Sequence, residues 1–148
     1  MPASTTSFLF PDVNVWLALA VGGHEHHGSA MSWYENSAPA SRLFFCRLTQ
    51  LGLLRLLTTD AVMGNGVMDQ NQAWSAYDEL LEDERTSLVE EPTSLERIFR
   101  GMTKLKRSAP KDWADSYLMA FAEACAFRLV TFDRGLAEKA QSACLLRG

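Results

Sequence analysis

Three aspartates in this chain lie where carboxylates could share one divalent cation. Asp12 and Asp133 each follow a short apolar run, and Asp115 lies inside an apolar stretch. Carboxylates gathered in one cleft repel one another and raise one another's pKa, so such a cluster is useful mainly when a dication neutralises it. Mg²⁺ and Mn²⁺ prefer carboxylate and water oxygens, and substrate phosphate often completes their shell. These residue types therefore predict a divalent-cation site.

A simpler interpretation competes for each aspartate. An Asp just past a strand is often only a helix N-cap, which accounts for Asp12 or Asp133 taken singly. Asp115 is harder to explain in that way, because apolar residues flank it on both sides of the predicted helix and an unpaired charge is costly there. Its early position in the helix also favours an anion. Asp112, one turn earlier, is interpreted as the cap.

The elements that position these residues alternate between strand and helix. We expect strands at 7–10, 42–46, 86–89, 128–132 and 143–146. We expect helices at 15–20, 27–36, 48–57, 69–84, 93–104 and 112–126, with a short one after residue 133. This order predicts an α/β fold with a largely parallel sheet and helices on both faces. In such sheets the ligand site lies beyond the carboxyl ends of the strands, where Asp12 and Asp133 fall.

Three sequence blocks carry a resemblance to a known family. Residues 8–19 (FLFPDVNVWLAL) resemble the opening motif of PIN domains, and residues 113–118 (WADSYL) and 129–135 (LVTFDRG) resemble their closing pair. The order and spacing of the blocks resemble the VapC-type toxins from Phe8 to about Leu146. The resemblance implies one PIN-like three-layer α/β/α domain over 1–148, ordered over about 7–147, with a small, mostly parallel sheet. It also implies a metal-dependent endoribonuclease, often dimeric, that an antitoxin silences.

The family's functional residues are carried over onto the matching positions. Asp12, Asp115 and Asp133 become the catalytic acids that bind Mg²⁺ or Mn²⁺, and their carboxylates are expected to converge within reach of one ion. Asn14 and Thr131 become supporting residues that orient those carboxylates. The implied reaction is phosphodiester hydrolysis of RNA, in which the ion activates a water and neutralises charge on the phosphate. Two arginines are candidates for phosphate contacts, against the alternative of simple surface charge: Arg47 and Arg55.

One position departs from the family pattern. The family usually places a Glu on the short helix after the second strand, and in the matching block, 46–57, we align Gln50 with it. The Gln side chain is expected to face the same cleft, but it lacks a charge that contributes about 4 kcal/mol at 4 Å and an effective dielectric near 20. Either three acids suffice, or the chain is a weakened or inactive PIN-like binding module. Three acids are candidate substitutes: Glu25, Asp60 and Asp112.

Charge is unevenly distributed along the chain. The net charge of −4 is unusual for a nucleic-acid-binding protein. Residues 69–91 hold eight acids and one Arg, whereas six basic residues follow with almost no compensating acid: Arg97, Arg100, Lys104, Lys106, Arg107 and Lys111. That segment could attract phosphate, or it could be a solvated helix face.

Other classes of protein fit less well. An aspartyl phosphohydrolase needs a second acid at the position of Asn14, and a Rossmann dinucleotide binder needs a Gly-x-Gly-x-x-Gly after the first strand, which is missing. The histidines of the segment 24–27 lack the i, i+4 spacing of a zinc protease and are interpreted as capping or solvent-exposed. The four tryptophans and eight phenylalanines mostly follow helical spacing and are interpreted as core.

The remaining features suggest a cytoplasmic protein. The three widely spaced cysteines (Cys46, Cys125 and Cys144) predict reduced, buried thiols. We expect neither an export signal nor a membrane span, because no apolar run reaches about 18 residues. The helices at 27–36 and 69–84 are candidate surfaces for a homodimer.

Overall fold

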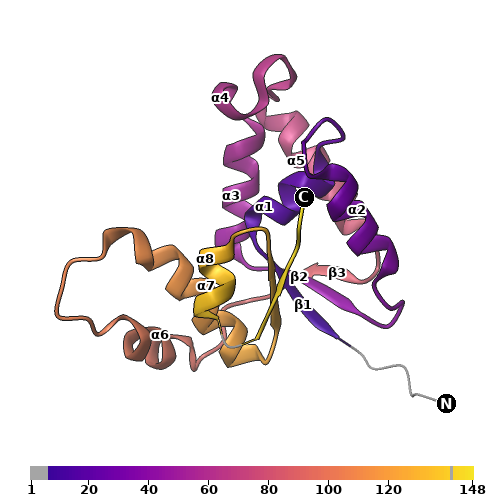
Figure 1. Cartoon of the computed structure of the whole chain (residues 1–148). Coiled ribbons are helices and arrows are strands. Elements are labelled where there is room, and N and C mark those ends of the chain that lie inside the picture. Colours follow the sequence, from indigo (N-terminus) through magenta and orange to yellow (C-terminus); the bar gives the residue numbers. More distant parts are fainter. Residues whose placement is uncertain (1–6, 141) are drawn as a thin grey trace.

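Five short strands form one parallel sheet in the computed structural model, which describes residues 7–140 and 142–148 (Figure 1). The strands are β1 (Phe8–Pro11), β2 (Arg42–Phe45), β3 (Thr86–Leu88), β4 (Arg128–Thr131) and β5 (Ala143–Leu145). Their order is β3-β2-β1-β4-β5, and each neighbouring pair is parallel. Because all five run the same way, their carboxyl ends meet at one edge. The predicted parallel sheet is confirmed.

Helices fill the connections between the strands. Their bounds are α1 (Val13–Ala20), α2 (His27–Asn36), α3 (Arg47–Leu57), α4 (Asp60–Met63), α5 (Gln70–Leu81), α6 (Leu95–Thr103), α7 (Trp113–Cys125) and α8 (Arg134–Lys139). Two 3₁₀ turns accompany them, η1 (Gly64–Gly66) and η2 (Pro110–Asp112). All the predicted helices are present. The short α4 was not predicted, because a four-residue helix is too short to show a hydrophobic period.

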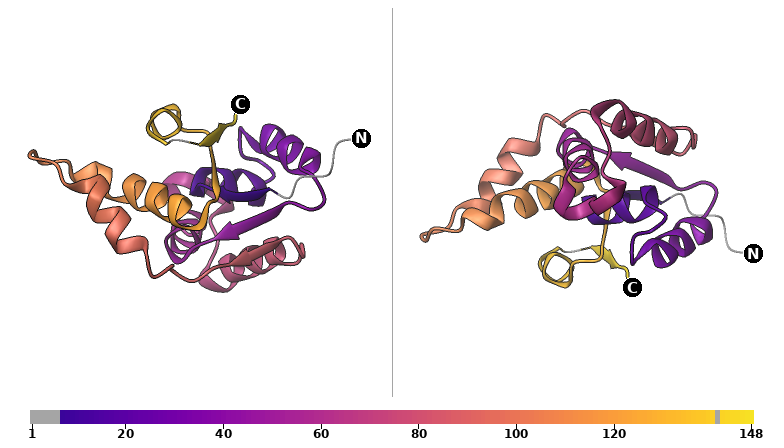
Figure 2. Two further views of the ribbon diagram at one scale, coloured as in Figure 1. Left: turned by 90° about the horizontal axis from the view of Figure 1, so that it is seen from below. Right: turned by 90° about the horizontal axis from the view of Figure 1, so that it is seen from above.

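The sheet divides the core into two halves. Successive strand residues point to opposite faces, so Leu9 and Phe10 belong to different hydrophobic clusters. The cluster of Leu9 joins the sheet to α1, α2, α3 and α5, and Trp16 stacks on Phe45 there at 3.9 Å between ring centroids. The cluster of Phe10 joins it to α6, α7 and α8, and Phe10 stacks on Phe121 at 5.1 Å. The three-layer α/β/α arrangement is therefore confirmed (Figure 2).

The direction of α7 decides where Asp115 lies. Only Ala126 and Phe127 separate the end of α7 from β4. Ala126 takes a left-handed conformation, φ 56°, which turns the chain sharply after the helix. The carboxyl end of α7 thus lies at the amino end of β4. The first turn of α7, which carries Asp115, lies at the other end of the helix, toward the carboxyl edge of the sheet.

Two further expectations concern cysteines and membranes. Cys46 is fully buried, and burial raises the pKa of its thiol, but Cys125 and Cys144 are only half-buried. All three are free thiols, so the prediction of reduced cysteines agrees with the structure and that of complete burial is wrong for two of them. In the described part of the chain, no helix is both long and apolar enough to cross a membrane.

Candidate active site

Asp12 comes directly after β1 and forms the N-cap of α1. Its Oδ1 accepts the backbone N–H of Val13 at 2.7 Å, and its Oδ2 accepts the hydroxyl of Thr131 at 3.0 Å. Burial raises the pKa of the Asp12 carboxyl, the two hydrogen bonds partly offset this, and the charges of Asp115 and Asp133 raise it further. The ionised carboxylate is thus held firmly in a place that disfavours its charge.

Thr131 connects the two aspartates that follow the strands. It ends β4 and is completely buried. Its hydroxyl donates to Asp12 and accepts the backbone N–H of Asp133 at 3.0 Å. Asp133 is the N-cap of α8, since its Oδ1 accepts the N–H groups of Gly135 at 2.8 Å and Leu136 at 3.2 Å. One buried hydroxyl therefore fixes the turn after β4 to the carboxylate after β1.

Asn14 adds a second connection between the same two turns. Its Oδ1 accepts the backbone N–H of Phe132 at 3.4 Å. Phe132 lies between Thr131 and Asp133, so the amide holds the first turn of α1 against the chain that carries Asp133. This contact is with the backbone, and Asn14 acts on the aspartates by positioning the turn.

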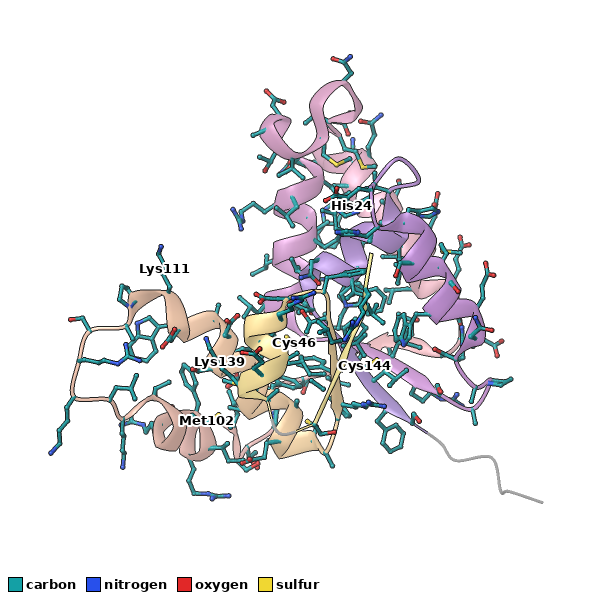
Figure 3. The ribbon with its side chains drawn as sticks, viewed as in Figure 1. His24, Cys46, Met102, Lys111, Lys139 and Cys144 are labelled. Carbon is teal, nitrogen blue, oxygen red and sulfur yellow. The ribbon has the colours of Figure 1, made fainter. Side chains whose placement is uncertain are left out.

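Asp115 lies in the first turn of α7 and pairs with Lys139. Figure 3 labels this lysine. Lys139 Nζ lies 3.6 Å from Asp115 Oδ2 and 3.7 Å from Asp112 Oδ1. Arg107 lies 3.8 Å from the second oxygen of Asp112. Asp112 stands at the N-cap position of α7, but its side chain makes no capping hydrogen bond. The predicted cap position of Asp112 is therefore confirmed, but its carboxylate engages two cations and accepts no backbone N–H.

The three candidate acids lie near one another without forming a ready set of ligands. Among the residues that the structure describes, no three His, Cys, Asp or Glu side chains are arranged so that they could hold a metal ion. The expected convergence on one ion is not met. The reason lies in the contacts above: Asp12 and Asp133 cap helices, and Asp115 turns to Lys139. Carboxylates without a dication also repel one another.

The chemistry of this donor set nevertheless suits a hard dication. Three carboxylates come from the carboxyl ends of β1 and β4 and from the amino-terminal turn of α7, and two of them act electrostatically on the third. A cation of charge +2 would relieve that repulsion, and carboxylates are the ligands that Mg²⁺ and Mn²⁺ prefer.

Gln50 does not join these acids. Its side chain is 5% exposed, and its Oε1 accepts Nη1 of Arg47 at 2.5 Å. Gln50 also forms a hydrogen bond with the hydroxyl of Tyr77. Burial raises the pKa of this hydroxyl, and the hydrogen bond with Gln50 offsets part of that rise. No side-chain hydrogen bond found in the described part of the chain connects it to any of the three aspartates. The expectation that Gln50 faces their cleft is therefore not supported.

Gly52, two residues further along α3, faces the first turn of α1, which directly follows Asp12. A Cβ at this glycine would lie 2.6 Å from Cγ2 of Val13, the residue next to Asp12. Residues two apart on an α-helix point about 200° apart, so Gln50 and Gly52 occupy opposite faces of α3. The absence of a side chain at Gly52 allows α3 to approach the first turn of α1 closely.

The two candidate arginines are also on α3. Arg47 and Arg55 are both exposed, and the hydrogen bond to Gln50 directs Arg47 toward that side chain. No hydrogen bond or salt bridge found among the described residues connects either arginine to the aspartates. They stay predictions, with the solvated surface as the alternative.

A sizeable, mostly apolar pocket of the described residues lies elsewhere. It measures about 710 Å³ and lies at the amino ends of β1 and β4, beside the second half of α7. Phe8, Met102, Met119 and Phe127 make much of its wall apolar, and none of the three candidate aspartates lines it. An apolar pocket is unsuited to holding a dication or a phosphate, so the acids rather than the pocket define the candidate site.

A three-layer fold with a parallel sheet, an aspartate after its first and fourth strands and a third on the helix between them defines a class of protein. The PIN domain family model matches residues 9–141, and the chain belongs to this family. It is 42% identical over 129 residues to Ribonuclease VapC41 of Mycobacterium tuberculosis, which covers 84% of this chain and 88% of that protein.

Solved structures agree on the fold. The chain is similar to VapC20 of Mycobacterium tuberculosis, described as a toxin that cleaves the Sarcin-Ricin loop, with a TM-score of 0.68 and 15% identity over 94% of this chain and 99% of that chain. It is also similar to a chain of the VapBC2 complex of Rickettsia felis bound to a promoter DNA fragment, with a TM-score of 0.67 and 12% identity over 95% and 99%. At these identities the likeness supports the fold alone.

Sequence reasoning missed Lys139 and Gly52. Lys139 follows Asp133 by six residues on a helix too short to reveal its face, so nothing in the sequence indicated a contact with Asp115. Gly52 carried only a weak signal, because an isolated glycine in a helical pattern does not show which element packs against it.

Proposed function

We propose that this protein is a metal-dependent endoribonuclease and the toxin of a toxin–antitoxin pair. The observation that carries the proposal is the buried hydroxyl of Thr131, which holds Asp12 beside the turn of Asp133 while the charge of Asp115 acts on Asp12. The 42% identical relative is a ribonuclease by name, which supports RNA as the substrate.

In the proposed site, Asp12, Asp115 and Asp133 hold Mg²⁺ or Mn²⁺. When bound, such an ion makes a water nucleophilic near neutral pH and neutralises charge that develops on the scissile phosphate. Thr131 and the N–H of Val13 keep the Asp12 carboxylate oriented. The Lys139 ammonium lies 3.6 Å from Asp115 and partly neutralises that carboxylate in the absence of an ion.

The number of acids separates the active from the inactive alternative. The sequence of α3 contains no Asp or Glu, so this helix cannot supply a fourth carboxylate. Of the three substitutes considered, Glu25 pairs with His26 and is largely exposed, and Asp60 is exposed on α4. Asp112 shares Lys139 with Asp115 and is the substitute nearest the site. A weakened or inactive binding module remains the second candidate because of this missing acid.

The proposal is tested by cleavage of a mixed RNA pool after EDTA treatment and re-addition of Mg²⁺ or Mn²⁺. We expect cleavage only with the ion, and a loss on the order of 100-fold or more in Asp12→Asn, Asp115→Asn and Asp133→Asn, since these remove proposed ligands outright and even outer-shell substitutions cost 10- to 100-fold. Asp69→Asn is the matched control, because Asp69 is also a helix N-cap, accepting the N–H of Gln72 at 2.8 Å, but it caps α5 and is not one of the proposed ligands.

Two outcomes would reject this function. Cleavage that persists in all three site variants, or that proceeds equally in EDTA, rules out the metal site. A purified chain that cuts no RNA with either ion, while its unfolding transition stays cooperative, favours the inactive binding module.

The proposed partners are RNA, an antitoxin protein and a second copy of the chain. The proposed location is the cytoplasm. Exposed apolar side chains occur on the neighbouring helices α3, α4 and α5 and on the turn between η1 and α5: Leu48, Leu51, Val62, Trp74 and Val67. Figure 1 draws these helices together in the upper part of the fold. Exposed apolar side chains on adjoining helices suit a surface that another chain covers. Of the two helices proposed for the homodimer, α5 contributes Trp74, which is 46% exposed. Sedimentation showing only monomer at high concentration would count against the dimer.

A further inference from the structure

A strongly basic segment connects α6 to α7. We call residues 97–111 the basic arm: it comprises most of α6, the loop 104–109 and the start of η2. The arm contains six of the chain's fourteen Lys and Arg residues and no Asp or Glu, although the whole protein carries a net charge of −4. A local concentration of one sign on a protein of the opposite sign is a candidate binding surface for a polyanion.

Most of this charge is free to meet a ligand. All six basic residues of the arm are exposed. Arg100 pairs with Glu96 at 2.9 Å on the helix surface, and Arg107 lies 3.8 Å from Asp112. The other four have no salt bridge to any described residue: Arg97, Lys104, Lys106 and Lys111. The alternative of a solvated helix face accounts poorly for them, because the loop carries half of the arm's charge and belongs to no helix.

The arm projects from the body of the domain. In both views of Figure 2 the turn between α6 and α7 is the part furthest from the sheet. Lys111 points outward at this end in Figure 3. The loop therefore offers its lysines to a ligand that is larger than the domain's own clefts, as a nucleic-acid strand is.

Salt bridges connect the loop of the arm to the candidate acid Asp115. Arg107 contacts Asp112, Asp112 contacts Lys139, and Lys139 contacts Asp115. This run of alternating charges connects the arm to the first turn of α7. A strand of RNA that lies along the arm would therefore be close to the acids that are proposed to cut it.

Two exposed apolar side chains accompany the charges. Trp113 is 56% exposed and Leu105 47%, and both line a small hollow of about 40 Å³ between the loop of the arm and the first turn of α7. The Trp113 ring makes an edge contact with Phe99, with 6.0 Å between centroids, so one ring is fixed in place while much of it stays open. Fixed aromatic rings beside basic residues are the combination on which single-stranded bases stack.

We propose that the basic arm is the docking surface for single-stranded RNA, with Lys104, Lys106 and Lys111 on phosphates and Trp113 stacked on a base. The proposal rests on the proposed function for the identity of the ligand. It assigns the arm to binding only, and the cutting step to the acids.

The test measures binding and cutting separately. Binding of a fluorescent single-stranded RNA of mixed sequence is followed by anisotropy in EDTA over a series of salt concentrations. The variant Lys106→Ser/Lys111→Ser is compared with Arg42→Ser/Arg128→Ser, which removes two exposed charges at the amino ends of β2 and β4. If each lysine neutralises one phosphate, the slope of log K against log salt becomes shallower by about 1.4, and affinity at about 0.1 M salt falls roughly 25-fold. The control variant should keep the slope of the parent protein.

The outcomes distinguish this inference from the nuclease proposal. Equal slopes and affinities in the arm variant and the parent overturn the arm, even if the parent cuts RNA with Mn²⁺ added. An arm variant that loses affinity supports the arm, even if no RNA is cut with any ion. A parent protein that fails to bind RNA at low salt also overturns the arm. Retained RNA binding with lost binding of an antitoxin would reassign the surface to that protein.

Discussion

Replacing Thr131 by valine tests the linkage at the centre of the candidate site. Valine has nearly the shape of threonine, so Thr131→Val removes the hydroxyl without opening a cavity in this fully buried position. Two hydrogen bonds disappear together: the one donated to Asp12 and the one accepted from the backbone N–H of Asp133, each 3.0 Å long.

The expected loss of stability comes from the two groups that lose their partner, the Asp12 carboxylate and the backbone N–H of Asp133. A hydrogen bond to a charged group contributes about 1.5–3 kcal/mol, and a buried N–H left without a partner costs about 1–3 kcal/mol. Water can reach part of the half-buried Asp12, which reduces the first figure. We expect Thr131→Val to lower the free energy of unfolding by about 2–4 kcal/mol, a large share of the 5–15 kcal/mol of a typical domain.

Thr131→Ser is the matched control. Serine keeps the hydroxyl and loses one buried methyl group, which costs about 1 kcal/mol. Both variants are measured by urea denaturation at neutral pH in EDTA. A valine variant as stable as the serine variant would show that the hydroxyl does not hold the site together.

Two further predictions concern single residues of the site. Because burial raises the folded-state pKa of Asp12 above its usual 3.8, its ionised form destabilises the fold at neutral pH. Asp12→Asn should therefore increase the free energy of unfolding at neutral pH in EDTA. This increase should disappear as the pH falls through the raised pKa toward 3.8. Urea denaturation across that pH range that shows no increase would contradict the raised pKa. Gln50→Glu should leave Mn²⁺ affinity unchanged in calorimetry, because the side chain at this position meets Arg47 and Tyr77. Tighter binding would show that residue 50 reaches the ion after all.

The sheet and the positions of Asp12, Asp133 and Asp115 were predictable from the sequence. The first apolar run is followed by Pro11 and Asp12, which are unfavourable inside a strand. The later run also ends at an aspartate, because Asp133 follows Thr131 and Phe132. The parallel order then places both aspartates at one edge. These inferences needed only local patterns and the rule that parallel strands share their carboxyl edge.

The sequence of α3 does not show which of its faces packs against α1. Apolar residues occur nearly all round this helix, so its hydrophobic period does not indicate which side meets α1. The close approach of Gly52 to Val13 makes that choice, and it depends on contacts between helices far apart in the chain. The pairing of Lys139 with Asp112 and Asp115 was hidden for the same reason, since it needs the relative placement of α7 and α8.

The cap interpretation and the catalytic interpretation of Asp12 differ in what they require of its charge. Asp69 shows what a cap alone needs: it is exposed and exchanges two hydrogen bonds with Gln72. Asp12 caps α1 from a site that disfavours its ionised form, with two further carboxylates adding to the repulsion. An uncharged Asn, Ser or Thr could accept the same N–H without that penalty. The cap therefore explains an oxygen at position 12 but not a charge. The proposed cation, shared by the three carboxylates, would account for that charge.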